Sequence, residues 1–381
     1  MPLRVLHVTR DFPPNVNGGL SVAVGGLVEA QVRAGIECVV VSFDDYRSGG
    51  SVRRDPERTT TPSGISVLHV RGKSALKRTQ ELATNFIADV VHVHHELLWD
   101  FATDVARFND SSTVFTVHVL QSEQNRLRDV QTTQSSKAQV KALAECSILH
   151  APSQAVADVL INSTLRLGNR LRTVRLAGDD WPDAIAASEQ ERFVGPPMLL
   201  YVGRFADICG FAELLEALPP LLAAHPTLEV TIAGGMPDNP RSEKRWKKRW
   251  TRLGGDDAHR VHWAGWRSSN ELSELYAAAT MLVVPSWFET FGQVVLEGML
   301  HGTPLITTGA GAIAELVDED SALLIAIKDP EAIVDAVEAL LADPEAAEQR
   351  RLNALRRVQS GAHWDDRMNA FRSLYQAAMD S

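Results

Sequence analysis

The stretch that decides the fold of this 381-residue chain is Pro285-Ser-Trp-Phe-Glu-Thr-Phe-Gly-Gln-Val-Val-Leu-Glu-Gly-Met-Leu-His-Gly-Thr-Pro304. It follows an apolar run at residues 281–284, which predicts a buried strand, and from Phe291-Gly292 onward it has the apolar spacing of an amphipathic helix. The run Leu305-Ile306 predicts the next strand. Strand, loop, helix and strand in this order indicate a parallel α/β sheet, in which ligands bind at the carboxyl ends of the strands.

Two glutamates flank the start of this helix. Glu289 lies in the loop before it, and Glu297 lies about five residues inside it, which at about 1.5 Å per residue puts the second carboxylate roughly 7–8 Å deeper. Between them are the backbone N–H groups of Phe291, Gly292 and Gln293, where the positive end of the helix dipole suits a phosphate. This order matches the parts of a sugar nucleotide: Glu289 for the sugar, the amides for the diphosphate and Glu297 for the ribose.

The stretch resembles the E-x7-E signature of retaining glycosyltransferases of the GT4 family, with Thr290 beside the first acid counted among the donor-binding residues. The resemblance implies the GT-B fold, in which two Rossmann-like, doubly wound parallel-sheet domains face each other across a cleft. It also implies a metal-independent hexosyltransferase of EC class 2.4 with no cofactor besides its co-substrate, a UDP-linked sugar. The hexose would pass to the hydroxyl of a small acceptor with its anomeric configuration retained. Because no second carboxylate can be placed beneath the anomeric carbon, the resemblance favours front-face attack with the leaving diphosphate as base.

Short apolar runs recur between helical segments on both sides of an interruption at Gly195-Pro-Pro197. They are residues 4–9, 38–43, 65–70, 90–94, 114–118, 148–151 and 173–176 before it, and 198–202, 228–233, 261–264, 281–284, 305–307 and 323–327 after it. Such runs predict two parallel sheets. We expect an acceptor domain at residues 1–190 and a sugar-nucleotide domain at 191–363, with a polar loop at 47–63. The resemblance adds that the C-terminal helix, residues 364–381, crosses back to the first domain.

In the first domain, the resemblance assigns Gly18, Gly19 and His118 to the site. Gly18-Gly19 follows Pro-Pro where the first strand leads into a helix, and adjacent glycines let a ligand approach the backbone. In GT4 chains this loop faces the donor phosphates and the acceptor. His118 ends a predicted strand and resembles the family histidine that contacts the donor sugar near the anomeric centre, although a strand-end histidine is more often structural.

In the second domain, Arg204 lies two residues after the strand at 198–202, where it can bind a diphosphate through two parallel N–H groups and stabilise the leaving group. We count it as catalytic together with His118 and Glu289. The family pattern continues with a lysine before a glycine, but this chain has Cys209-Gly210. That departure leaves open a sugar-nucleotide-binding protein with weakened catalysis. Trp266 follows the strand at 261–264 and resembles the loop that carries the nucleotide base, but a plain strand end explains it nearly as well.

A second alternative is an NAD-dependent oxidoreductase. Gly309-Ala-Gly-Ala-Ile-Ala314 fits the pattern G-x-G-x-x-G/A, but it comes late in its sheet, whereas a dinucleotide fingerprint belongs to the first βα turn. We interpret it as the small-residue loop that, in GT4 chains, ends in a glutamate beside the phosphates, here Glu315.

No metal site is expected from the sequence. On a strand, His92 and His94 share one face and His95 takes the other, so this run does not supply three convergent ligands. We interpret them as buried strand-end histidines on the acceptor side. Asp318-Glu-Asp320, the only Asp-x-Asp in the chain, is interpreted as a solvated turn.

Composition limits the partners. A net charge of −10 argues against nucleic-acid binding, which needs a basic face. Three separated cysteines, a start with no signal peptide and no apolar run near 18 residues predict a cytoplasmic protein. The basic run at 241–252, with Trp246 and Trp250 one turn apart, is compatible with a peripheral membrane helix. We prefer a solvated face with both tryptophans packed inward.

The acceptor is poorly specified. Four acids follow strand ends of the first domain and suit an amino-bearing small molecule, but solvated loop acids explain them equally well. They are Glu96, Asp100, Asp104 and Glu123.

Overall fold

The structure of the protein, a computed structural model, describes all residues except 1, 17, 44–55, 71–79, 82, 164, 179–194, 236–239 and 359–362. The chain forms two compact units. The first consists of Met1–Asp179 and His363–Ser381, and the second of Asp180–Ala362. The boundary expected between residues 190 and 191 lies outside the described residues, whereas the C-terminal segment groups with the first unit.

The first unit is built on an eight-stranded sheet with the order β3-β4-β2-β1-β5-β6-β7-β8. All its neighbouring strands pair in parallel except β3 and β4. In chain order the strands are β1 (Arg4–Thr9), β2 (Glu37–Ser42), β3 (Glu57–Thr60), β4 (Ser66–His69), β5 (Val90–Val93), β6 (Ser112–Thr116), β7 (Ile148–Ala151) and β8 (Leu171–Thr173). Interior strands such as β5 and β7 are buried along their whole length, as expected for a sheet covered on both faces. The predicted doubly wound parallel sheet is confirmed.

The polar segment at 47–63 is not all loop, so this part of the prediction was wrong. Residues Glu57–Thr60 form β3, which pairs antiparallel with β4 at the edge of the sheet. The strand is mostly exposed and carries charged and polar side chains. An edge strand of this composition has no apolar face, so the hydrophobic pattern that revealed the other strands was missing.

Helices cover both faces of the first sheet. They are α1 (Gly19–Arg33), α3 (Trp99–Asn109), α4 (Gln121–Arg128), α5 (Gln134–Glu145), α6 (Gln154–Ile161) and α15 (Met368–Met379). Phe115 of β6 packs edge-on against Trp99 of α3, with ring centroids 5.9 Å apart. The next residue, Thr116, points to the opposite face, where it bonds to His92, and His92 bonds to Tyr375 of α15. The C-terminal helix therefore packs on the face opposite to α3.

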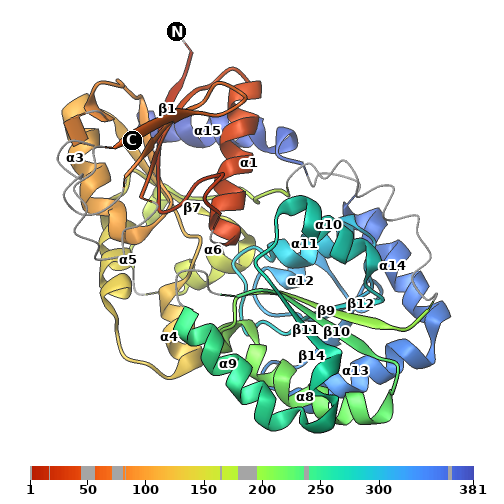
Figure 1. Cartoon of the computed structure of the whole chain (residues 1–381). Helices are drawn as coiled ribbons and strands as arrows, with labels where there is room; N and C mark the ends of the chain where they lie inside the picture. Colours follow the sequence, from red (N-terminus) through yellow and green to blue (C-terminus); the bar gives the residue numbers. More distant parts are fainter. Residues whose placement is uncertain are drawn as a thin grey trace. The chain divides into compact units, whose positions relative to one another are not determined.

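The second unit contains a six-stranded parallel sheet with the order β11-β10-β9-β12-β13-β14 (Figure 1). In chain order the strands are β9 (Met198–Gly203), β10 (Glu229–Gly234), β11 (Val261–Gly265), β12 (Met281–Val284), β13 (Leu305–Thr308) and β14 (Leu323–Ile325). Each lies within three residues of the range predicted for it, because every one of them is a short apolar run bounded by polar or turn residues.

Seven helices are described in the second unit. They are α8 (Phe211–Ala224), α9 (Pro240–Leu253), α10 (Ser269–Ala278), α11 (Gln293–Leu300), α12 (Ile313–Leu316), α13 (Pro330–Ala342) and α14 (Pro344–Val358). Val283 of β12 belongs to the core formed with α8 and α13. Leu282, the residue before it, faces α11 instead, and a β-carbon on Gly298 would lie 2.5 Å from its Cδ2 atom. Gly298 thus lets α11 lie close against β12.

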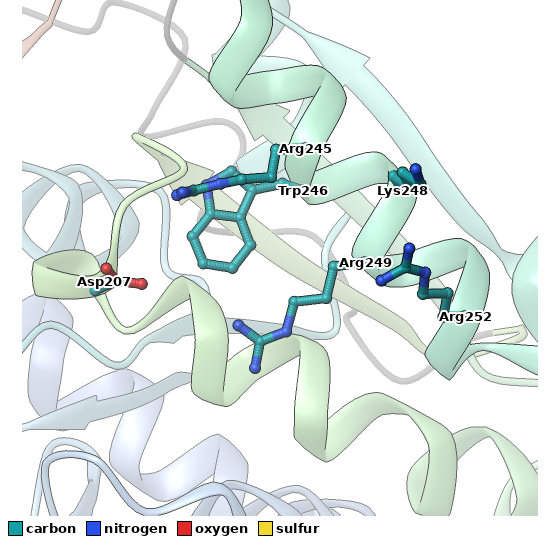
Figure 2. A pocket seen from close by; sticks show the side chains of 6 residues that line it. All are labelled: Asp207, Arg245, Trp246, Lys248, Arg249 and Arg252. Carbon is teal, nitrogen blue, oxygen red and sulfur yellow. The ribbon is translucent and has the colours of Figure 1, made fainter.

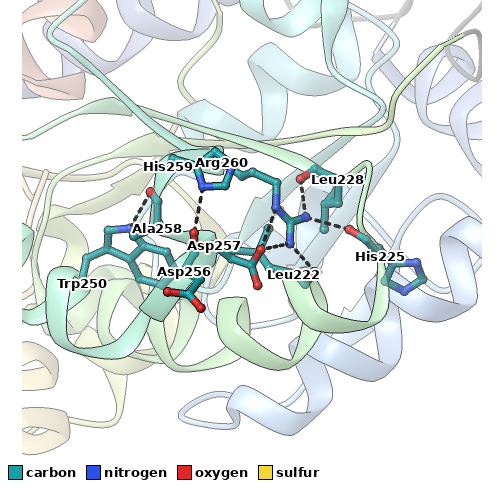
Figure 3. A network of polar contacts seen from close by, with 9 residues as sticks. All are labelled: Leu222, His225, Leu228, Trp250, Asp256, Asp257, Ala258, His259 and Arg260. Carbon is teal, nitrogen blue, oxygen red and sulfur yellow. Dashed lines mark hydrogen bonds and ion pairs between the residues drawn. The ribbon is translucent and has the colours of Figure 1, made fainter.

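A buried arginine holds the end of α8. The guanidinium of Arg260 donates to the backbone carbonyls of Leu222, His225 and Leu228, and it also pairs with the carboxylate of Asp257 (Figure 3). Helix C-termini leave carbonyl groups without intrahelical partners, and a cation there also favours the helix dipole. Arg260 therefore fixes α8, the helix that begins directly after Cys209-Gly210.

Candidate functional site

Glu289 lies in the loop between β12 and α11, and its backbone is held by the loop that follows β13. The N–H of Glu289 donates to the carbonyl of Ala310 at 3.4 Å, and the N–H of Ala312 donates to the carbonyl of Glu289 at 2.8 Å. Both loops leave the carboxyl ends of neighbouring strands. The backbone that carries the first predicted acid is therefore fixed by pairing between two loops.

The small residues at 309–314 have a structural reason that the sequence did not reveal. Gly311 has φ +66°, and a β-carbon there would lie 2.3 Å from the carbonyl oxygen of Glu289. The helix after this loop, α12, has only four residues. Close packing against Glu289 thus explains the second glycine of the G-x-G-x-x-A pattern, and a dinucleotide is not needed to account for it.

Helix α11 begins at Gln293, with Gly292 as its N-terminal flanking residue at φ 85°. This start is close to the expected one at Phe291-Gly292. No acid occupies the first turn and no side chain caps it. The first N–H groups of a helix have no intrahelical acceptor and carry positive partial charge. The N-terminus of α11 is thus suited to bind an anion, and Thr290 and Phe291 directly precede it in the chain.

Glu297 is buried inside α11, and two neighbours fix its carboxylate. The hydroxyl of Tyr276 in α10 donates to Oε2 at 2.7 Å, and the side-chain amide of Gln293 donates to Oε1 at 3.0 Å. Burial, followed by the charge of Glu297 and their hydrogen bond, raises the pKa of Tyr276 well above its ordinary value, so the tyrosine remains a donor. Sequence reasoning missed Tyr276, because no local signal links α10 to α11.

Arg204, Cys209 and Glu289 come together at the carboxyl ends of β9 and β12. Burial raises the pKa of the Glu289 carboxyl, while a hydrogen bond from Ser286 and the charge of Arg204 act in the opposite direction. Burial also raises the pKa of the Cys209 thiol, against the effect of Arg204. The cysteine that replaces the expected lysine therefore lies near both the predicted catalytic cation and the predicted sugar-binding acid.

The turn at Gly210 holds this arrangement in place. Its φ is +67°, and a β-carbon there would lie 2.0 Å from the carbonyl oxygen of Pro285. The neighbouring backbone pairs as well, since the N–H of Trp287 donates to the carbonyl of Ile208 at 2.9 Å. The loops after β9 and β12 thus touch through their backbones, and only glycine fits at this position.

A second cation near this loop was also missed in the sequence. The Nζ atom of Lys328 lies 4.2 Å from the centroid of the Trp287 ring. The indole N–H of Trp287 donates to the carboxylate of Glu213 at 3.2 Å. A lysine beyond β14 could not be linked to the β12–α11 loop by any sequence motif.

Trp266 lies at the end of β11 and is 39% exposed. The residue before it, Gly265, has φ +71°, which turns the chain at the carboxyl end of the strand. The backbone contact of this loop with a nucleotide base remains a prediction.

The remaining predicted residues, Gly18, Gly19 and His118, belong to the first unit. Gly18 precedes α1, which begins at Gly19, and the hydroxyl of Ser21 donates to the Gly18 carbonyl at 2.8 Å. His118 follows the end of β6, is half-buried, and its Nε2 lies 3.0 Å from Nδ1 of His94. Their contacts with substrate remain predictions.

Three of the four candidate acceptor acids are engaged by basic side chains of the same unit. Asp100 pairs with Lys141, Asp104 with Arg107, and Glu123 with Arg126. Glu96 is buried and accepts from the side-chain amide of Gln121 at 3.0 Å. These contacts give the acids structural roles.

His92 and His94 lie on the same face of the sheet, as expected from their spacing on a strand. Their ring centroids are 4.1 Å apart, whereas His95 accepts from the N–H of Leu97. One ring nitrogen each of His7, His92 and His94 lies within 4.8 Å of the others, a spacing that a metal could use. In the Asp318 turn, the carboxylate pairs with Arg357 and accepts from the hydroxyl of Ser321.

The basic helix α9 borders a pocket of about 660 Å³ (Figure 2). Its lining residues are Asp207, Arg245, Trp246, Lys248, Arg249 and Arg252. Both Trp246 and Trp250 are only 3% exposed, and Trp246 packs edge-on against Phe211 of α8. The inward-packed interpretation of α9 is correct, so its aromatic rings are not available to enter a membrane. Among the described residues, no helix combines the length and the apolar character needed to span a bilayer.

The chain is similar in sequence and in structure to known proteins. Residues 196–343 match the family model described as Glycosyl transferases group 1, and residues 17–174 match Glycosyltransferase Family 4. The chain is 29% identical to a glycogen synthase of Mycobacterium tuberculosis, covering 99% of this chain and 95% of that protein. It is similar in structure to sucrose-phosphate synthase from Thermosynechococcus elongatus (TM-score 0.78, 21% identity, 98% of each chain). It also resembles HepE of Anabaena in complex with UDP and glucose (TM-score 0.75, 17% identity, 98% and 99% covered).

Proposed function

Because this chain belongs to the GT4 glycosyltransferases and has the two α/β units of the GT-B fold, we propose that it transfers a hexose from a UDP-linked donor to a small acceptor hydroxyl. It is a transferase of EC class 2.4.

The observation that carries the proposal is the grouping of Arg204, Cys209 and Glu289 beside the open N-terminus of α11. A diphosphate at this helix N-terminus accepts hydrogen bonds from the backbone N–H groups and from the guanidinium of Arg204. Glu289 is then placed to accept hydrogen bonds from sugar hydroxyls. Glu297, held by Tyr276 and Gln293, accepts from the ribose hydroxyls at the other end of the donor.

The chemical step needs little from the protein except charge stabilisation and orientation. The acceptor oxygen attacks the anomeric carbon from the face that the diphosphate leaves, so that one C–O bond forms while the C–O bond to the phosphate breaks. The acceptor proton passes to the departing phosphate oxygen, and UDP is released with the configuration kept. Arg204 and the helix N–H groups stabilise the charge that develops on the diphosphate. His118 supplies a ring nitrogen to a hydroxyl of the substrate.

UDP is favoured over other nucleotides because HepE, with which this chain shares its fold, is described in complex with UDP and with UDP-glucose. A reducing compartment such as the cytoplasm fits the three free cysteines. An amino-bearing acceptor stays a prediction, because Asp100, Asp104 and Glu123 pair with basic side chains and Glu96 is buried. Metal-independent transfer is part of the proposal, since Arg204 and α11 supply positive charge at the diphosphate.

A second candidate function is a sugar-nucleotide binder with weakened catalysis, and Cys209 is the observation that favours it. Titration calorimetry with UDP, GDP and ADP tests the shared donor site, and tight binding of UDP is expected. A transfer assay with UDP-hexoses and a panel of acceptor alcohols then separates the two functions. NMR of the product reports the anomeric configuration. An inverted product contradicts the front-face mechanism, and absence of binding to every nucleotide contradicts both functions.

A further inference from the structure

A row of polar side chains lies buried in the first unit, between its sheet and the helices α1 and α15. Eight hydrogen bonds join it end to end, from the carbonyl of Val174 to the ring of His118. From the Val174 end, the side chains before His118 are His150, Thr116, His92, Tyr375, Gln31, His7 and His94. Each of these seven is at most 1% exposed.

The carbonyl of Val174 fixes the first proton. A carbonyl only accepts, so Nε2 of His150, 2.7 Å away, must carry a hydrogen. Nδ1 of the neutral ring is then an acceptor, and the hydroxyl of Thr116 must donate to it at 2.8 Å. With its one hydrogen used, the Thr116 oxygen can only accept, so Nε2 of His92 donates to it at 2.6 Å. His92 in turn accepts at Nδ1 from the hydroxyl of Tyr375 at 2.9 Å.

The remaining hydrogen bonds run through Gln31 of α1 to His118. The Tyr375 oxygen now accepts, which requires the amide nitrogen of Gln31 to face it at 2.7 Å. The Gln31 oxygen therefore faces His7, whose Nε2 donates to it at 2.8 Å. His7 accepts at Nδ1 from Nε2 of His94 at 3.0 Å, and His94 accepts at Nδ1 from Nε2 of His118, also at 3.0 Å. Every proton in the row follows from one carbonyl.

We propose that this row of hydrogen bonds sets the tautomer of His118, keeping its proton on Nε2 and making Nδ1 the acceptor for a hydroxyl of the substrate. The tautomer follows from the geometry alone, whereas the substrate contact rests on the proposed function. Thr116, Tyr375 and Gln31 are positioning residues in this scheme, because they act on His118 through other side chains. The C-terminal helix thereby takes part in the site through Tyr375.

The pKa values of histidines in the row agree with neutral rings. Burial lowers the pKa of His7 and His150 to about 4, and burial together with His150 and His95 lowers that of His118 to about 3. The same row also accounts for the three nitrogens that a metal could use. Each unprotonated nitrogen of His7, His92 and His94 already accepts a hydrogen bond.

The test is the protonation of the His118 ring, read by ¹⁵N NMR of the nucleotide-free protein labelled at histidine. Wild type is expected to show His118 protonated at Nε2 only. Thr116→Val keeps the shape of the side chain but removes the hydroxyl, which detaches the row from Val174. The reverse orientation, in which Gln31 flips and every remaining bond reverses, then becomes available. His118 should show both tautomers in this variant, and Thr116→Ser, which keeps the hydroxyl, should restore the single one.

Tyr375→Phe interrupts the row at a different place and replaces Thr116→Val in this test if that variant does not fold. It should also give both tautomers. Wild-type His118 protonated at Nδ1, or a single unchanged tautomer in both Thr116→Val and Tyr375→Phe, overturns the assignment. These measurements use no ligand, so they hold or fail independently of the proposed function.

Ligand affinity tests the proposed contact between His118 and the substrate. If Thr116→Val populates the two tautomers equally, its affinity for a UDP-hexose should fall about twofold, because only the competent fraction binds fully, while its affinity for UDP stays unchanged. Thr116→Ser should match wild type with both ligands. Mixed tautomers without any loss of affinity for the UDP-hexose overturn the role of His118 as an acceptor for the sugar. Failure of wild type to bind UDP or any UDP-hexose is a failure of the proposed function instead.

Discussion

Gly311 packs so closely against Glu289 that a β-carbon on the glycine would lie 2.3 Å from the glutamate carbonyl oxygen. The two residues come from loops after neighbouring strands, and the N–H of Ala312 binds the same carbonyl. The position of the first acid of the E-x7-E pattern therefore depends on a glycine 22 residues further along the chain.

Gly311→Ala should destabilise the protein by about 1–3 kcal/mol, because the new methyl group meets backbone and the φ of +66° disfavours alanine. Displacement of Glu289 should also lower transfer activity. Gly309→Ala is the matched control, since a β-carbon there meets nothing within 4 Å. Urea unfolding and the transfer assay measure both effects. Equal stability of the two variants would show that the contact with Glu289 does not constrain this loop.

Glu297→Ala should weaken UDP binding about 10- to 100-fold, because hydrogen bonds to a charged group contribute about 1.5–3 kcal/mol. Tyr276→Phe should weaken it less, since the carboxylate stays but loses the hydroxyl that orients it. Glu274→Ala, an exposed acid on the same helix as Tyr276, is the control and should bind as wild type does. Titration calorimetry provides the measurement. Unchanged affinity in Glu297→Ala removes the ribose role.

Cys209→Lys should strengthen UDP binding or leave it unchanged, because it adds a cation beside Arg204 where diphosphate charge is expected. Repulsion from Arg204 limits the gain. Cys209→Met, similar in size to the lysine stem but uncharged, should bind UDP as wild type does. The comparison uses calorimetry and turnover of the UDP-hexose. A marked loss of affinity in the lysine variant alone would mean that this position does not face the diphosphate.

Stability should fall steeply as the pH drops from 6.5 towards 4.5. His7 and His150 have folded pKa values of about 4, so they stay neutral in the native state while the unfolded chain takes up protons near pH 6.5. The unfolded state then binds more protons, and each of these histidines removes about 1.4 kcal/mol per pH unit below 6.5. Above that pH their contribution is constant.

Urea unfolding at several pH values checks this slope. His150→Gln removes one titrating ring and should flatten the slope, even though it lowers stability at neutral pH by breaking bonds to Thr116 and Val174. Acids with depressed pKa values act at lower pH: the hydrogen bonds from Ser268 hold the pKa of Glu271 at about 2. A stability that is flat between pH 7 and 5 would contradict the neutral, buried histidine row.

The sequence by itself determined the two parallel sheets and the order of their strands along the chain. Runs such as Met281–Val284 are short, apolar and bounded by turn residues, so local chemistry specifies them. It also located Glu289, Glu297 and the start of α11, because all three lie within one continuous strand–loop–helix segment. The edge strand Glu57–Thr60 escaped detection because it has no apolar face.

The tertiary structure decided which residues support that segment. Tyr276 reaches Glu297 from another helix, Gly311 fits against Glu289 from another loop, and Gly210 makes room for Pro285. The histidine row is the extreme case, since Tyr375 joins it from 283 residues beyond His92. Contacts of this kind depend on the packing of distant segments and the direction of single hydrogen bonds, and neither leaves a periodic or compositional signal in the chain.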